Sequence, residues 1–172
     1  MKKLFILVLV MLCCFSCVCV LSEADEHEVI ALEDGLYIVS FSTDSSMFRI
    51  NETYGKSAVL VVSNGEMYVH VTLVSKNIVN LFFGSAEEAK QDSVELIVPS
   101  LDTVTYSDGY TEKVYGFDIP VPTIGEDFTV SIIGKKGKWY EHTVSVSEPV
   151  PIDQADQEFA QILVSYLNFE EQ

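Results

Sequence analysis

The chain has 172 residues, of which 26 are acidic and only 10 are lysine or arginine, so its formal net charge is −16. Nucleic acids and anionic lipid surfaces repel a chain this acidic, which argues against both as partners. Its length suits one domain with a terminal extension, and a domain of this size buries enough surface to fold without disulfides.

All four cysteines lie within the apolar run at residues 4–21, which follows two lysines. A basic start, an apolar run that is short for a membrane span and a small-x-small triplet ending at Ala24 predict an export signal over residues 1–24. Cleavage after Ala24 would leave a chain without thiols, which excludes disulfides, cysteine metal sites and thiol catalysis. We therefore expect an extracytoplasmic protein, either secreted or attached to the cell envelope.

The same segment also has a second interpretation, as a lipid anchor. Phe15-Ser16-Cys17 resembles a relaxed bacterial lipobox, in which Cys17 would become the lipidated first residue. The serine fits that motif, whereas Cys14 stands where an aliphatic residue is usual. Lipidation would tether the protein to a membrane and cleavage after Ala24 would release it; of the two, we favour cleavage.

After an acidic leader at 25–33, short runs of β-forming residues are separated by turn residues up to residue 147. The expected strands lie at 36–42, 58–62, 66–74, 81–83, 94–98, 114–119, 128–133 and 139–146. Asn64-Gly65 is a strong hairpin signal between two of them, because both residues tolerate positive φ. This spacing predicts an all-β protein, an antiparallel immunoglobulin-like β-sandwich over residues 34–147.

Two helical segments interrupt or follow the strands. Residues 85–90 are rich in helix formers and predict a turn or two of helix. The second helix is expected in the terminal extension at 148–172, after Pro151, with Asp153 as a candidate N-cap. Its apolar residues recur at helical spacing, and they are Phe159, Ile162, Leu163 and Tyr166. We expect this short amphipathic C-terminal helix to pack against its own domain, with docking onto a partner as the alternative.

The sequence carries no signature of a known catalytic site. It contains no G-x-S-x-G, no H-E-x-x-H and no phosphate-binding glycine loop. His70 is expected to be solvated on the polar face of a strand, and His142 to be partly buried and hydrogen-bonded. Scattered histidines of this kind do not make a transition-metal site, so we expect a protein that is not an enzyme.

Two segments differ from ordinary strand and turn sequence. Residues 43–49 form a polar break that presents Met47 and Phe48, and at 138–144 the only tryptophan and Tyr140 follow a cluster of lysines. Aromatic and flexible apolar side chains beside cations are suited to a flat apolar ligand that bears carboxylates. In a simpler interpretation, Met47 and Phe48 plug one end of the sandwich, Tyr140 packs inward and the lysines solvate a turn.

Several strings in this chain are similar to one known family. They are D-G-L-Y-I-V-S-F at 34–41, S-S-M-F at 45–48, the apolar run at 58–62, N-G-E-M-Y-V at 64–69 and a hairpin that closes on Tyr140. In this order they resemble the NEAT domains, exported immunoglobulin-like modules of Gram-positive surface proteins, many of which bind haem. Strings at 44–48, 84–89 and 138–140 also resemble related domains in surface lipoproteins of Firmicutes.

The NEAT resemblance implies haem as the cofactor. Haem-binding members hold the iron through a tyrosine on the last strand, which Tyr140 matches. A second tyrosine four residues later supports the first one; here that position is Val144, so the hydrogen bond that favours tyrosinate is missing. His142 lies on the same strand face and is a candidate substitute.

The resemblance also implies the remaining contacts. Residues 45–48 match a short helix that covers the ligand, which implies pocket roles for Met47 and Phe48 and propionate contacts for Ser46, Lys136 and Lys138. Some NEAT domains bind proteins instead of haem. The leading hypothesis is an exported module that captures haem or a related porphyrin. The alternative is an extracellular protein- or glycan-interaction module without a cofactor, which allows Tyr140 to be buried, whereas haem capture needs it at a solvent-exposed pocket mouth.

Overall fold

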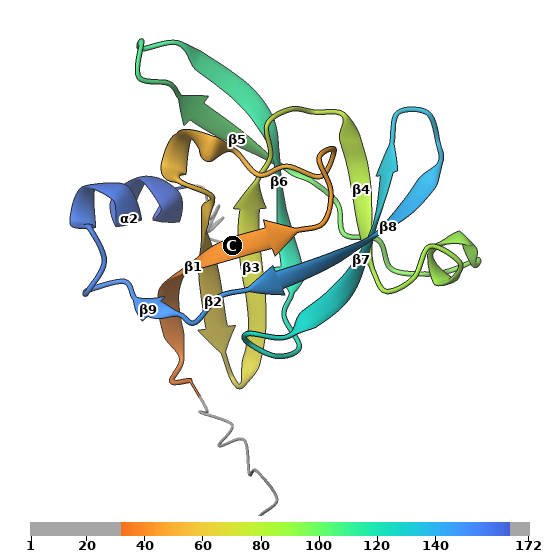
Figure 1. The fold of residues 1–172 in the computed structure, drawn as a ribbon, viewed down its shortest axis with the longest axis horizontal. Coiled ribbons are helices and arrows are strands. Elements are labelled where there is room, and N and C mark those ends of the chain that lie inside the picture. Colours follow the sequence, from red (N-terminus) through yellow and green to blue (C-terminus); the bar gives the residue numbers. More distant parts are fainter. Residues whose placement is uncertain (1–31, 166–172) are drawn as a thin grey trace, which may run out of the picture. The chain divides into compact units, whose positions relative to one another are not determined.

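A computed structural model describes residues 32–165; the predicted export signal, Cys17 and most of the acidic leader lie outside the described residues. The described chain folds as the expected antiparallel immunoglobulin-like β-sandwich with a short C-terminal helix (Figure 1). Its strands are β1 (Gly35–Thr43), β2 (Ser57–Ser63), β3 (Glu66–Thr72), β4 (Ile78–Phe83), β5 (Ser100–Thr105), β6 (Thr111–Pro120), β7 (Asp127–Gly134), β8 (Trp139–Val146) and β9 (Val150–Pro151). Its helical segments are the 3₁₀ turns η1 (Glu52–Tyr54) and η2 (Glu88–Lys90) and the α-helix α2 (Gln157–Val164).

Strand β1 belongs to both layers of the sandwich. Its first part, residues 35–40, pairs with β2, and its last part, residues 41–43, pairs with β8. The strands consequently follow one continuous order, β4-β7-β8-β1-β2-β3-β6-β5, with β9 added beside β1. This crossing places the residues after β1 next to β8, although the two segments are far apart in the sequence (Figure 1).

The main core lies between the layers and follows from the period-two alternation of the strands. Val39, Leu60 and Val69 point inward from one layer, and Leu81 and Val130 point inward from the other. All five side chains are buried. Because burial of such side chains is the dominant favourable term in folding, this alternation fixes the register of the pairs.

A second apolar cluster lies on the outer side of β2, β5 and β6. Val59, Val61, Val104 and Val114 are buried there together with Leu163 of α2. Strand β2 is therefore apolar on both faces, which explains its unbroken apolar run. The prediction that the C-terminal helix packs against its own domain is confirmed. The predicted helical residue Tyr166 lies outside the described residues.

The structure corrects several local predictions. Residues 94–98 were expected to be a strand, but only Ile97 makes a bridge there, to Leu81. The strand is instead β5, which the sequence did not predict because its buried positions include Asp102. Helix α2 begins at Gln157 and not near Asp153, since the chain first pairs as β9 with β1. In residues 32–165, no helix is long and apolar enough to cross a bilayer.

Candidate functional site

Asp44 connects the loop after β1 to strand β8 through hydrogen bonds. Its backbone N–H donates to the carbonyl of Thr143 at 3.1 Å, and the Thr143 N–H donates to Asp44 Oδ2 at 3.2 Å. The other carboxylate oxygen, Oδ1, lies 2.9 Å from Nδ1 of His142, which is 98 residues away in the chain. The two segments that the sequence marks as unusual thus meet at one end of the sandwich.

A serine shapes the loop itself. The N–H groups of Met47 and Phe48 both donate to the hydroxyl of Ser45, at 3.1 and 3.0 Å. Side-chain capping of this kind replaces the backbone hydrogen bonds that a strand would make. The resulting turn directs Phe48 inward, where it is fully buried, and leaves Met47 with 62% of its surface exposed.

Phe48 is a core residue. Its ring packs edge-on against Phe41, with centroids 5.8 Å apart, and lies 6.4 Å from the ring of His142. The simpler interpretation, in which Phe48 plugs one end of the sandwich, describes its place, and the ring offers no exposed surface to a ligand. Met47 does not share this role.

Tyr140 does not pack inward. The side chain has 40% of its surface exposed, and Lys138 Nζ lies 4.9 Å from the centre of its ring. The contact is a cation–π interaction, which holds a positive charge over the ring face. Tyr140 therefore presents an exposed aromatic side chain beside a cation.

His142 lies between these features, and its two ring nitrogens differ. Nδ1 faces Asp44, while Nε2 is buried and has no hydrogen-bond partner. The N–H of Thr143, followed by the hydrogen bond and charge of His142, lowers the pKa of Asp44, so this carboxylate stays ionised at neutral pH. The two ring nitrogens are thus in different surroundings, one facing a carboxylate and the other facing no hydrogen-bond partner. The expected partly buried, hydrogen-bonded state of His142 is confirmed.

Lysines gather at the same end of the sandwich. The loop between β3 and β4 contacts the β7–β8 hairpin, because the Lys135 N–H donates to the carbonyl of Asn77 at 3.2 Å. The four exposed side chains here, which we call the basic tip, are Lys76, Lys135, Lys136 and Lys138. The opposite end carries exposed carboxylates at Glu33, Asp34, Glu66 and Glu126. The protein is thus acidic overall but has a basic end.

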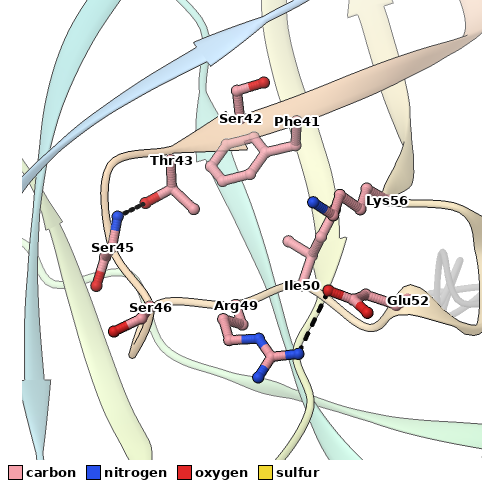
Figure 2. Close-up of a pocket in the computed structure, with 9 residues that line it drawn as sticks. All are labelled: Phe41, Ser42, Thr43, Ser45, Ser46, Arg49, Ile50, Glu52 and Lys56. Carbon is pink, nitrogen blue, oxygen red and sulfur yellow. Dashed lines mark hydrogen bonds and ion pairs between the residues drawn. The ribbon is translucent and has the colours of Figure 1, made fainter.

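A pocket of about 370 Å³ lies beside the loop (Figure 2). Its lining residues are Phe41, Ser42, Thr43, Ser45, Ser46, Arg49, Ile50, Glu52 and Lys56. Of the predicted site residues only Ser46 lines it, while Met47, Phe48, Tyr140, Lys136 and Lys138 do not. Arg49 Nη2 pairs with Glu52 Oε1 at 3.3 Å, so the lining combines hydroxyls with an ion pair. The pocket and the exposed Tyr140 side chain are therefore two separate features.

His70 is buried, so its predicted solvation is wrong. Its Nε2 lies 3.2 Å from Asp102 Oδ2 and its Nδ1 lies 2.7 Å from Asp118 Oδ1. Thr72 and Ser100 donate their hydroxyl protons to Asp102, whose side chain is fully buried. Burial opposes the charged imidazolium, but the two carboxylates outweigh it and raise the pKa of His70 to about 9. With both nitrogens engaged, His70 has a structural role.

Sequence reasoning missed this cluster because its members come from three strands. Asp102 lies on the unpredicted strand β5, and no local pattern marks it as buried. Gly116 of β6 is the one available signal, since a Cβ there would collide with the Asp102 carboxylate.

Among residues 32–165, no three His, Cys, Asp or Glu side chains are grouped to hold a metal ion. No family model matches the chain, and no curated protein matches it.

Proposed function

We propose that this protein is an exported, non-enzymatic binding module that captures haem at the cell envelope. The observation that carries the proposal is the junction between the Asp44–Phe48 loop and β8. The NEAT resemblance needs these two segments side by side, and the hydrogen bonds of Asp44 join them across 98 residues of sequence.

The exposed side chains at this junction suit a flat apolar ligand. Met47 is flexible and polarizable, and Tyr140 offers a ring face. Exposed apolar side chains that gather next to polar ones are typical of binding sites. Buried Phe48 would support the site from below through its contact with His142 and would not touch the ligand.

The charges at this end suit a ligand with carboxylates. Lys136 and Lys138 of the basic tip lie at the hairpin that leads into Tyr140, and the hydroxyl of Ser46 lies on the facing loop. Lysine is a compact cation that attracts carboxylates without demanding one geometry. Haem propionates would meet these groups, while the remaining acidic surface keeps the exported protein soluble.

The donor atoms also suit haem. A porphyrin brings four nitrogen ligands of its own, so the protein needs to supply only an axial donor. Tyr140, which the resemblance assigns to this role, and His142 both lie on the β8 face next to the loop. Of the two, Tyr140 is the exposed side chain and therefore the axial donor we propose.

A haemin titration tests the proposal. We expect the purified protein to give a saturable, shifted Soret band at one equivalent of haemin. Tyr140→Ala should weaken binding about tenfold or more, because it removes the exposed ring. Tyr110→Ala is the control, since Tyr110 is also an exposed tyrosine and lies on the β5–β6 turn. A spectrum identical to free haemin, or equal losses in both variants, would refute haem capture at this end.

The pocket beside the loop favours a second candidate, a glycan-interaction module without a cofactor. Its hydroxyls and the Arg49–Glu52 ion pair are typical of sites that bind sugars. Calorimetric titration with neutral and acidic oligosaccharides tests this candidate. Arg49→Gln should weaken a genuine glycan contact and leave haemin binding unchanged.

A further inference from the structure

The pocket beside the loop after β1 carries two cationic side chains in a protein whose net charge is −16. We propose that this pocket binds a sugar unit that bears a carboxylate, a uronic acid, and that Lys56 and Arg49 recognise the carboxylate. The inference rests on the second candidate function, the glycan-interaction module, and names its ligand class. It does not depend on haem capture.

The first argument is the charge of the lining. Arg49 is the only arginine in the chain, and it lines the pocket together with Lys56 and Glu52. Arg49 pairs with Glu52 at 3.3 Å, whereas Lys56 makes no ion pair among the described residues. Figure 2 shows these three side chains along one side of the pocket. A cation without a partner in an acidic protein attracts an anionic ligand to that place.

The second argument is the excess of hydrogen-bond donors in the lining. The Ser45 hydroxyl accepts the N–H groups of Met47 and Phe48, at 3.1 and 3.0 Å. Both lone pairs of this oxygen are thus engaged, so the hydroxyl has only its proton to offer to a ligand. Lysine and arginine side chains also donate only. A carboxylate accepts only, whereas each hydroxyl of a neutral sugar brings a proton that needs an acceptor.

The rest of the lining suits a sugar ring. Phe41 and Ile50 are buried and supply an apolar surface, while Ser42 and Ser46 add hydroxyl groups. The Glu52 carboxylate can accept protons from sugar hydroxyls. A volume of about 370 Å³ is at the small end of the range for ligand sites, so the pocket suits a small ligand. A uronic acid combines an apolar ring face, hydroxyls and one carboxylate.

The third argument is the backbone of Lys56, whose φ of 64° lies in the left-handed region. A side chain in this region crowds its own backbone, so glycine is the residue that suits it best. Strained residues of this kind gather at binding and active sites, where a particular side chain is required. The lysine at this position therefore calls for a role beyond folding, and the pocket supplies one.

Two glycosides that differ in one group test the proposal. Methyl β-D-glucuronide carries a carboxylate where methyl β-D-glucoside carries a hydroxymethyl group. In amide NMR titrations of the purified protein, we expect the glucuronide to shift the signals of Ser46 and Lys56 in a saturable way. The glucoside should bind at least about tenfold more weakly, because it lacks charge-assisted hydrogen bonds to the cations.

Lys56→Gly separates binding from folding. The change removes the ammonium group and relaxes the backbone, so the free energy of unfolding should be unchanged or higher. Affinity for the glucuronide should nevertheless fall at least about tenfold, since the carboxylate loses a cationic donor. Lys113→Gln is the matched control, because it removes an exposed lysine of β6 that does not line the pocket. This control should bind the glucuronide as wild type does.

The outcomes separate the ligand class from the function on which it rests. Equal affinities for the two glycosides, with shifts at the pocket, overturn the carboxylate preference and leave the glycan-interaction module standing. Binding of neither glycoside overturns the inference, and oligosaccharides that also fail to bind overturn the module itself. A Lys56→Gly protein that binds the glucuronide as wild type does, or that is less stable than wild type, overturns the role assigned to Lys56.

Discussion

The two structured histidines show how neighbouring groups decide what a side chain can do. Each lies on a strand and faces an aspartate. His70 has a carboxylate at both nitrogens and is held as a buried cation, whereas His142 has one carboxylate and one unpartnered nitrogen. Of these two histidines, only His142 has a ring nitrogen without a hydrogen-bond partner. The difference comes from β5, which brings Asp102 to His70 and has no counterpart beside His142.

The His70 cluster predicts a dependence of stability on pH. Its folded-state pKa of about 9 lies above the usual 6.5. The stabilisation is therefore complete below about pH 6.5 and is lost as the pH rises through 9. A shift of this size corresponds to about 3 kcal/mol. Urea unfolding between pH 6 and pH 10 should show this loss.

His70→Gln should remove that pH dependence. It should also destabilise the protein by about 3 kcal/mol near neutral pH, since Asp102 would be left as an unpaired buried charge. Asp118→Asn should reduce the pH dependence only in part, because Asp118 is largely exposed, its ion pair is screened by water, and Asp102 stays in place. Unfolding curves of wild type and His70→Gln with the same pH profile would contradict the assigned role of His70.

At the scale of elements, strand β1 and helix α2 decide the architecture. The passage of β1 from one layer to the other brings the Asp44–Phe48 loop onto β8. Helix α2 covers an apolar face that would otherwise be exposed on the outer side of β2. The helix has eight residues, too few to be stable alone, so packing must hold it.

This packing predicts that Leu163→Ala destabilises the protein by about 2–5 kcal/mol, since Leu163 is buried against the sheet. Gln161→Ala on the exposed side of α2 should change stability by less than about 0.5 kcal/mol. Urea unfolding of both variants provides the measurement. Equal free energies of unfolding for the two variants would mean that α2 is not docked on the sheet.

In the described residues, clusters of basic and of acidic side chains lie at opposite ends of the sandwich. The net charge is −16, yet the basic tip lies at one end of the sandwich and exposed carboxylates lie at the other. Such a distribution orients an anionic ligand towards the basic end and repels it elsewhere. The attraction acts through exposed side chains, so salt should weaken it.

We therefore predict that the double variant Lys136→Gln/Lys138→Gln binds haemin about three- to tenfold more weakly at low salt. The difference should fade towards about 1 M salt, where the screening length is about 3 Å. Lys90→Gln, on η2 and paired with Glu87, is the control and should bind as wild type. Fluorescence quenching titrations at both salt concentrations measure this. A loss independent of salt would show that the lysines act through packing.

Local sequence was sufficient to predict the class of the fold and most of its strands. Alternating apolar residues and the Asn64-Gly65 turn are local features, and the sandwich they predicted is the one observed. The partly buried His142 and the apolar face of α2 also followed from residue types and their spacing. The export of the protein, its ligand and a lipid anchor at Cys17 are hypotheses drawn from the same local patterns.

Only the tertiary structure decided which of these side chains meet. The pairing of Asp44 with His142 spans 98 residues, and the burial of His70 depends on Asp102 from a strand whose polar sequence concealed it. The tertiary structure also decided that Phe48 lies in the core and Tyr140 at the surface, although both are aromatic. The physical reason is that hydrogen bonds and packing between distant strands depend on register and layer order, which no short window of sequence contains.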